Sequence, residues 1–452
     1  MSFQPPKPKS RPRRSSLWSY AQRFRRDILS AQPDHLFDAR MAEFKTPFFN
    51  SFLINEPGLV DEVLRVRPED FPKSNRIGEG LRPLLGESIF LTSGETWARQ
   101  RRIIDPAFAG GRLRASWLEM VASTEAAIRR LHGHAGRVID IEEEASHATA
   151  DVIFRALFSM PIETSQARAV YSAFCAYQRT APILNLAALI PLPRWVPRIF
   201  RSGTKRHAQD IRTLLRAMTL RRAEEIAAGT APDDLATRIM TTKDPETGSL
   251  FSPEEMVDQV AIFFLAGHET SASALSWALY LLASSPEWQE KVAVEARAVD
   301  CKNFNNAKRL TSAAHVLRET MRLYPPVPMM VREATGPERF RDRDVPKGAQ
   351  IVISPWHLHR HRKLWDEPDA FRPERWAEET TKATARAAYL PFSTGARVCP
   401  GAGFAMAEGI LMLSMITEAF EIAPVNTPEP VAHLTVRSRN GIHLRLTPRA
   451  KA

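Results

Sequence analysis

The chain has 452 residues, of which 44% are hydrophobic and 25% charged, a composition that indicates a folded protein with a large core. Its formal net charge of +11 favours an acidic protein partner or an anionic surface. No nucleic-acid motif accompanies this charge, so we expect no nucleic-acid ligand. Three scattered cysteines are too few for a disulfide framework and indicate a reducing compartment.

The N-terminal segment is rich in proline and basic side chains, and we expect residues 1–16 to form a disordered tail. A mitochondrial transit peptide is the alternative, although the prolines oppose the amphipathic helix that it needs. We expect residues 17–452 to form a single domain that starts with a helix. No run of about 18 apolar residues is present, so we expect no transmembrane anchor. The N-terminus is polar where a signal peptide has its apolar region, so we expect no signal peptide either.

The first half of the chain predicts mostly helices. Residues 46–54 read as a strand, and residues 94–108 as a helix in which Trp97 and Arg101 share a face, because they are four positions apart. A core tryptophan beside a surface arginine would look the same. The later stretch 181–200 is apolar but interrupted by three prolines, so it cannot be one continuous helix.

A long helix of about 32 residues is predicted within 252–285, with a capping box at its start and a length of about 48 Å at 1.5 Å per residue. Its centre reads AGHET, residues 266–270. A glycine inside a helix costs about 1 kcal/mol relative to alanine, and an acid beside an alcohol is unexpected in an apolar wall. Gly267 is therefore either a tolerated small residue or the opening of a groove, in which Glu269 and Thr270 pass protons.

Two further patterns lie downstream. Residues 312–324 predict a helix in which Glu319 and Arg322, three positions apart, can pair, and Arg375 follows within a Pro-Glu-Arg sequence. Near the C-terminus, Asn-Gly within residues 433–446 predicts a hairpin with a type I′ turn.

The segment FSTGARVCPG is the most informative of the chain. Cys399 can offer a thiolate to a metal, and its pKa would be lowered at the start of the helix that follows. Gly395 permits a left-handed turn, Gly401 removes side-chain bulk near the sulfur, and Phe392 shields the ligand from water. Arg397 can pair with a carboxylate. The alternative is a buried, inert cysteine beside a surface arginine.

Taken together, these motifs resemble those of the cytochrome P450 family. W-x-x-x-R, A-G-x-E-T, E-x-x-R with P-E-R, and F-x-x-G-x-R-x-C-x-G occur in the order of that family and span residues 97–401. The resemblance covers essentially the whole chain and implies a mainly helical cytochrome P450 fold with a smaller β-rich lobe. Ser271 stands where the family often has a second threonine, after the one that lies nearest the oxygen.

The resemblance also implies roles for individual residues. The iron ligand of haem b is Cys399, and the other haem-contacting residues are Trp97, Arg101, Arg332, Phe392, Gly395, Arg397 and Gly401. The proton-delivering and oxygen-groove residues are Gly267, Glu269 and Thr270. A buried structural triad is formed by Glu319, Arg322 and Arg375. The substrate pocket is lined by Ala266, Val327, Met329 and Met330.

The activity that the resemblance implies is monooxygenation, in which one oxygen atom of O2 enters a C–H bond of a hydrophobic molecule, such as a fatty acid, terpenoid or steroid. Electrons come ultimately from NAD(P)H through a separate ferredoxin or flavodoxin and its reductase, with Arg362 and Lys363 as candidate contacts. A peroxygenase or isomerase of the same fold, a haem-thiolate sensor and a haem-free helical protein are the alternatives. We expect a soluble, cytoplasmic, bacterial monomer.

Overall fold

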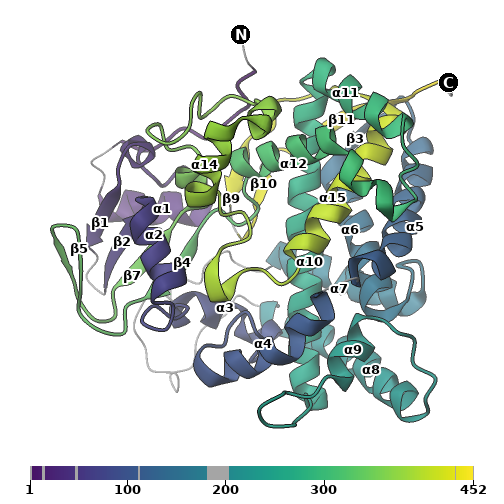
Figure 1. Ribbon diagram of the computed structural model, residues 1–452, viewed down its shortest axis with the longest axis horizontal. Coiled ribbons are helices and arrows are strands. Elements are labelled where there is room, and N and C mark those ends of the chain that lie inside the picture. Colours follow the sequence, from purple (N-terminus) through teal and green to yellow (C-terminus); the bar gives the residue numbers. More distant parts are fainter. Residues whose placement is uncertain are drawn as a thin grey trace. The chain divides into compact units, whose positions relative to one another are not determined.

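The structure is a computed structural model that describes residues 3–12, 16–45, 49–109, 112–180, 203–432 and 434–450. It is mainly helical with small sheets, as predicted (Figure 1). The α-helices are α1 (Leu17–Arg26), α2 (Pro57–Asp61), α3 (Asn75–Leu85), α4 (Gly94–Phe108), α5 (Arg112–His132), α6 (Ile141–Phe158), α7 (Ser165–Thr180), α8 (Thr204–Ala227), α9 (Leu235–Thr241), α10 (Pro253–Ala283), α11 (Pro286–Arg297), α12 (Thr311–Leu323), α13 (Pro355–Leu358), α14 (Glu379–Ala388) and α15 (Ala402–Ala419).

Short elements complete the fold. The strands are β1 (Met41–Lys45), β2 (Asn50–Ile54), β3 (Val138–Asp140), β4 (Met330–Glu333), β5 (Glu338–Phe340), β6 (Arg343–Val345), β7 (Gln350–Ile353), β8 (Phe420–Pro424), β9 (Pro430–Ala432), β10 (Val436–Ser438) and β11 (His443–Pro448). The other helical turns are η1 (Asp34–Phe37), the π-helix η2 (Glu62–Val66), η4 (Phe304–Arg309), η5 (Pro373–Ala377) and η6 (Gly395–Arg397).

Internal contacts divide the chain into two compact units. The first consists of Met1–Phe71, Met120–Ala148 and Glu269–Ala452, and it contains every strand of the described residues. The second consists of Pro72–Glu119 and Thr149–His268 and is helical. That residues 17–452 form one domain stays a prediction.

The largest sheet of the first unit has the order β1-β2-β7-β4. Strands β2 and β7 are parallel, with Phe52 opposite Ile351 and Ile54 opposite Ile353. These four side chains are fully buried in one hydrophobic cluster. Alternate residues of a strand point to the same face of the sheet. The two named residues of each strand are two positions apart, so all four side chains lie on one apolar face.

The long helix α10 begins and ends close to where the sequence predicts it. The amide of Glu255 donates to Oγ of Ser252 at 3.2 Å, and the amide of Ser252 donates to Oε2 of Glu255 at 2.8 Å. This reciprocal capping box satisfies two amides that a helix end otherwise leaves without partners. The helix is buried over most of its length, which its continuous apolar sequence allows.

The hairpin predicted within residues 433–446 is wrong. Strand β10 pairs with β9, whereas β11 pairs with β3 and β8, so the two segments flanking the Asn-Gly turn do not pair with each other. The Oδ1 of Asn440 accepts instead from the amide of Glu429 at 2.8 Å. Local turn chemistry predicts a turn correctly here, but more distant strands supply the pairing partners.

The N-terminal segment also differs from the disordered tail that we expected. Across its described part, residues 3–12, the carbonyl of Phe3 accepts from the amide of Phe371 at 2.9 Å, and the carbonyl of Pro6 accepts from the hydroxyl of Tyr324 at 2.6 Å. The prolines oppose a helix, and residues 3–12 form none, so their carbonyls are available to hydrogen-bond donors of the first unit.

One helix of the described residues, α15, has the length and hydropathy of a membrane span. Buried core helices of soluble proteins meet the same criteria, and 44% of α15 is buried. It packs against α11 and α12. Composition alone therefore does not make α15 a membrane-spanning segment.

Candidate haem site

Cys399 lies in the short loop between η6 and α15, and its side chain is exposed. The amide of Cys399 donates to the carbonyl of Phe392 at 2.9 Å, which closes the loop. Gly395 has a φ of +70°, and a Cβ atom there would overlap the carbonyl oxygen of Leu64 in η2. Only glycine meets both conditions, so the position of the cysteine depends on Gly395.

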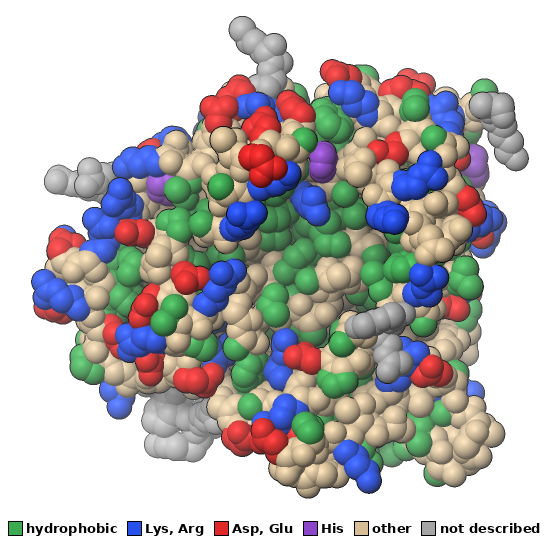
Figure 2. All heavy atoms as spheres, viewed as in Figure 1, with side chains coloured by type: hydrophobic (Ala, Val, Ile, Leu, Met, Phe, Trp, Pro, Cys, Tyr) green, Lys and Arg blue, Asp and Glu red, His purple; other side chains and the backbone are tan. Residues whose placement is uncertain are grey.

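The environment of the cysteine includes a largely apolar helix surface. Residues 402–410 of α15 are half-buried or exposed except for Glu408, whereas residues 411–417 are buried. Phe392, predicted as a shield, packs with Met406 against a small buried cluster of α10 and α12 that contains Leu317. Figure 2 shows apolar side chains gathered at the surface beside the first turns of α15. The cysteine therefore adjoins a surface that suits an apolar group.

Gly401 follows the cysteine by two positions. A Cβ atom there would lie at an ordinary contact distance of 3.9 Å from the Sγ of Cys399. Steric exclusion by this contact alone therefore does not require glycine, and the predicted role of Gly401 at the haem stays a prediction.

Two buried arginines of the first unit carry positive charge near one another. Arg332 on β4 and Arg397 on η6 are each less than a tenth exposed. Burial, with the nearby Arg397 charge, lowers the pKa of Arg332 to about 10. Burial likewise lowers the pKa of Arg397, although Glu69 opposes this effect.

The hydrogen bonds of Arg332 leave it able to bind an anion. The Nη1 of Arg332 donates to the carbonyl of Val331 at 3.2 Å, and the Nη1 of Arg397 donates to the carbonyl of Pro68 at 2.6 Å. Within the described ranges, the buried Nε of Arg332 has no hydrogen-bond partner. A buried guanidinium is stable only when an anion or acceptor compensates it, so this region suits the carboxylates of a ligand.

Glu319, Arg322 and Arg375 lie together in the core of the first unit. Both carboxylate oxygens of Glu319 accept from Arg322, at 2.8 and 2.9 Å, and Oε1 also accepts from Nε of Arg375 at 3.1 Å. All three side chains are at most 2% exposed. Burial raises the pKa of Glu319, but the Arg322 and Arg375 guanidiniums more than offset it, and its pKa is lowered overall.

The centre of α10 is less buried than the turns on either side of it. Ala266 is exposed, and Gly267 and Thr270 are half-buried. Within the second unit, a Cβ atom at Gly267 would lie 2.5 Å from Cδ1 of Ile153 in α6. Gly267 therefore has a packing role against α6, and its role in an oxygen groove stays a prediction.

Glu269 of α10 is held by two residues of the C-terminal segment. Its Oε1 accepts from the hydroxyl of Thr435 at 2.8 Å and from Nε of Arg437 at 3.2 Å, and its Oε2 lies 3.1 Å from Nη2 of Arg437. The sequence did not indicate Arg437, because the two residues are 168 positions apart and belong to no common motif.

Glu408 is a second residue that the sequence reasoning missed. It is 1% exposed on α15, and its Oε2 accepts from the hydroxyl of Ser271 at 2.7 Å. Burial raises its pKa to about 8, opposed only in part by the serine. A lone acid inside the apolar sequence GFAMAEGILML was the available signal.

In the second unit, the predicted pair on α4 shares a face as expected from its spacing. The guanidinium of Arg101 lies 5.9 Å from the centre of the Trp97 ring, and its Nε donates to Asp105 at 2.9 Å. Trp97 is buried.

The predicted pocket residues have mixed environments. Val327 is 37% exposed, Met329 is half-buried, and Met330 packs partly against the core of the β1-β2-β7-β4 sheet. The apolar stretch 181–200, predicted as a broken helix, lies outside the described residues.

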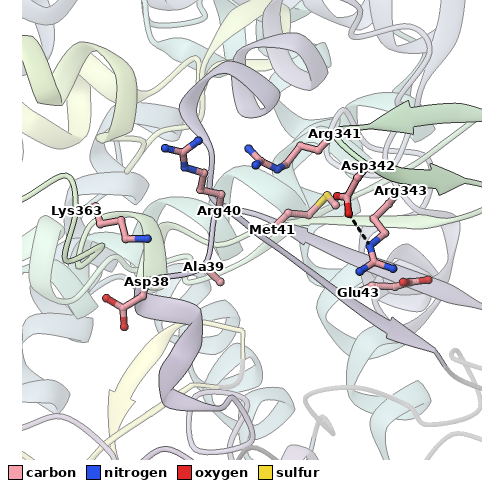
Figure 3. Close-up of a pocket in the computed structure, with 9 residues that line it drawn as sticks. All are labelled: Asp38, Ala39, Arg40, Met41, Glu43, Arg341, Asp342, Arg343 and Lys363. Atoms are coloured by element: carbon pink, nitrogen blue, oxygen red, sulfur yellow. Dashed lines mark ion pairs between the residues drawn. The ribbon is translucent and has the colours of Figure 1, made fainter.

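A separate hollow of about 650 Å³ opens on the first unit beside β1. Its walls are mostly charged, as Figure 3 shows: they are formed by Asp38, Ala39, Arg40, Met41, Glu43, Arg341, Asp342, Arg343 and Lys363. It contains none of the predicted haem or substrate residues, and its polar lining does not suit an apolar molecule.

The residues of the first unit fit a haem group by their chemistry. Cys399 supplies an accessible thiolate ligand, α15 supplies apolar surface, and Arg332 and Arg397 supply buried positive charge for carboxylates. Among the described residues, no cluster of three or more His, Cys, Asp or Glu side chains could hold a metal ion.

Comparisons with known proteins agree with this arrangement. A family profile described as Cytochrome P450 matches residues 40–445. The chain is 29% identical over 406 residues to a cytokinin hydroxylase of Arabidopsis thaliana, with 87% of this chain and 78% of the relative covered. It is 30% identical over 420 residues to cyclooctat-9-en-7-ol 5-monooxygenase of Streptomyces melanosporofaciens, with 91% and 87% covered. It is also 30% identical over 398 residues to cytochrome P450 4A11 of Homo sapiens, with 83% and 76% covered. With a haem-compatible cysteine loop and a profile match over most of its length, the chain belongs to the cytochrome P450 family of haem-thiolate monooxygenases.

Proposed function

We propose that this protein inserts one atom of O2 into a C–H bond of a hydrophobic small molecule, with haem b held by the thiolate of Cys399. The observation that carries the proposal is the cysteine loop, whose conformation requires Gly395 and which lies beside the apolar surface of α15 and the buried Arg397. A loop that served only packing would not need an exposed thiol beside buried positive charge.

In this proposal the haem supplies the activation of O2, and the thiolate favours cleavage of the O–O bond. Arg332 and Arg397 bind the propionates, where the carboxylates compensate their buried charge. Trp97 and Arg101 are assigned to the propionates by the motif alone. Phe392, packed on α12, excludes water from the sulfur.

Proton delivery falls to the centre of α10. Thr270 offers a hydroxyl and Glu269 a carboxylate one position before it, where the helix is less buried than in the adjoining turns. A carboxylate that accepts from both Thr435 and Arg437 is held in one orientation, so it must loosen before it can take up and pass a proton. The buried triad around Glu319 acts only on stability in this scheme.

The substrate is proposed to be largely hydrocarbon, such as a fatty acid, terpenoid or steroid. Ala266, Val327, Met329 and Met330 are the proposed lining residues, and all four are apolar. One relative is named for cyclooctat-9-en-7-ol and another for cytokinin, which supports a small organic substrate.

Electrons are proposed to come from NAD(P)H through a separate ferredoxin or flavodoxin with its reductase. The protein is proposed to act as a monomer in the cytoplasm. The net charge of +11 supports an acidic partner. Of the two candidate contacts, Arg362 already pairs with Asp34 and Asp38, which leaves Lys363 as the more available cation. Turnover with an acidic partner should fall steeply as salt rises, and a flat salt profile would exclude this mode of docking.

The test of the cofactor is the carbon monoxide difference spectrum of the purified protein after reduction with dithionite. A strongly red-shifted Soret band is expected for wild type, and Cys399→Ser should lose that band while its far-UV circular dichroism stays unchanged. A haem-loaded wild-type protein without the band would overturn the proposed ligand. Incorporation of oxygen from labelled O2 into a product then tests monooxygenation and separates it from peroxygenase or isomerase activity.

A further inference from the structure

A charged cluster lies next to the proposed proton-delivering acid. Arg437 of β10 donates to Glu269 of α10 through Nε at 3.2 Å, with Nη2 at 3.1 Å from the second oxygen. The same guanidinium extends its third nitrogen, Nη1, to 3.9 Å from Oε1 of Glu142 in α6. The side chains of Glu269, Arg437 and Glu142 are 10%, 20% and 13% exposed. Two carboxylates thus face one largely buried cation.

Glu142 is held less firmly than Glu269. Its Oε1 accepts from the amide of Ser438 at 3.1 Å, and the nearest Arg437 nitrogen lies beyond hydrogen-bond distance. Asp140 of β3 and Glu269 are the negative charges that face it. Burial, the largest effect, raises the pKa of Glu142 to about 7, with Arg437 and the Ser438 amide opposing and the two acids adding to the rise.

We propose that Arg437 is a positioning residue that holds the Glu269 carboxylate, and that Glu142 competes for the same guanidinium and so sets how firmly Glu269 is held. The inference rests on the proposed function, in which Glu269 delivers protons at the centre of α10. It concerns neither the iron ligand nor the substrate.

The competition has two charge states. While Glu142 is neutral, Glu269 is the only one of the two carboxyl groups that carries a charge to pair with Arg437. Glu269 also accepts a hydrogen bond from Thr435 at 2.8 Å. When Glu142 loses its proton to solvent, two carboxylates share one positive charge, and Nη1 is drawn toward Glu142 across the present 3.9 Å. The bidentate hold on Glu269 loosens, and its carboxylate becomes free to turn toward Thr270 and exchange protons.

The test compares four haem-loaded proteins: wild type, Glu142→Gln, Arg437→Lys and the control Glu143→Gln. Glu143 lies in the same helical turn as Glu142 but is exposed, so its substitution changes the same charge without touching the cluster. The first readout is the infrared band of protonated carboxyl groups, titrated from about pH 5 to 9. A fifth protein, Glu408→Gln, identifies the infrared signal of Glu408, whose buried carboxyl also has a raised pKa, about 8.

The second readout is the rate of NADH oxidation with a surrogate ferredoxin and reductase, and with dodecanoic acid as the substrate probe. Wild type and Glu143→Gln should show a carboxyl that titrates with a midpoint near pH 7 and a rate that rises several-fold through the same pH. Glu142→Gln should lose that band and stay at the low-pH rate. Arg437→Lys lacks the planar pair of nitrogens that grips both oxygens of Glu269, so it should stay at the high rate throughout.

Two results would overturn the inference: a titration near pH 7 that persists in Glu142→Gln, or an unchanged pH profile in Arg437→Lys. If Glu142→Gln does not fold, Arg437→Lys alone decides. The carbon monoxide spectrum separates the two proposals, because a wild type without the red-shifted band refutes the haem-thiolate function. A normal band with unchanged pH profiles refutes only the role of Glu142 and Arg437.

Discussion

Replacing Glu319 by glutamine should destabilise the protein severely although it removes only one charge. The carboxylate accepts five hydrogen bonds: from Arg322 at 2.8 and 2.9 Å, from Nε of Arg375 and the amide of Arg372 at 3.1 and 3.0 Å, and from Nε1 of Trp376 at 3.1 Å. A glutamine NH2 group in place of one oxygen would face donors instead of accepting from them.

The size of the expected destabilisation follows from the burial of these side chains. Glu319 and Arg322 are fully buried and Arg375 is 2% exposed, so the substitution leaves two guanidiniums in the core without this counter-charge. Removing one partner from a buried ion pair costs about 3–5 kcal/mol. Whole domains are stable by about 5–15 kcal/mol, so this one change removes a large part of the total.

Equilibrium unfolding in urea at pH 7, followed by circular dichroism, measures the change. The matched control is Glu374→Gln, which removes the same charge from a side chain that is 54% exposed and lies 3.6 Å from Arg372. An exposed ion pair of this kind contributes at most about 1 kcal/mol. If Glu319→Gln lost no more stability than Glu374→Gln, the buried triad would not be the stabilising unit that its geometry indicates.

The pH dependence of the free energy of unfolding tests the same contribution of Glu319. The pKa of Glu319 is lowered in the folded protein, so its contribution is present above the ordinary carboxyl pKa and is lost as pH falls through the folded value. The stability difference between wild type and Glu319→Gln should therefore shrink in acid, below about pH 4.

Three further predictions concern the haem loop and the charged groups. Gly395→Ala should cost more than about 1–2 kcal/mol, because the positive φ and the contact with the Leu64 carbonyl both oppose a Cβ atom, and it should lower haem retention. Gly336→Ala, with open space and no positive φ, is its control in thermal unfolding. Arg332→Met should leave the haem-free protein as stable or more stable, since it removes a buried charge. The same substitution should weaken haem binding by roughly 10-fold or more in a haem-transfer assay. Equal effects on stability and on haem binding would contradict the assignment of Arg332 to a propionate. Glu142 has a raised pKa, so its stabilising contribution is present below the ordinary carboxyl pKa and is lost as pH rises through about 7. The free energy of unfolding, measured in urea at pH 5 and pH 8, should change with pH less in Glu142→Gln than in wild type, by up to about 3 kcal/mol, and an identical pH dependence would refute the shift.

Features that depend on neighbouring residues were predictable from the sequence alone. The Ser252–Glu255 capping box predicted where α10 begins, because both of its hydrogen bonds join residues three positions apart. The cysteine loop was predictable for the same reason, since a left-handed glycine and a thiol four positions later must share one short segment.

Which distant groups meet depends instead on the tertiary fold. The Asn-Gly turn was predicted to join two paired strands, but β10 and β11 pair with other strands, because strand pairing depends on long-range partners. Likewise, Glu269 and Arg437 are 168 positions apart, and no local pattern relates them. Their pairing arises because a buried carboxylate requires a counter-charge, and the fold, not the motif, brings one within reach.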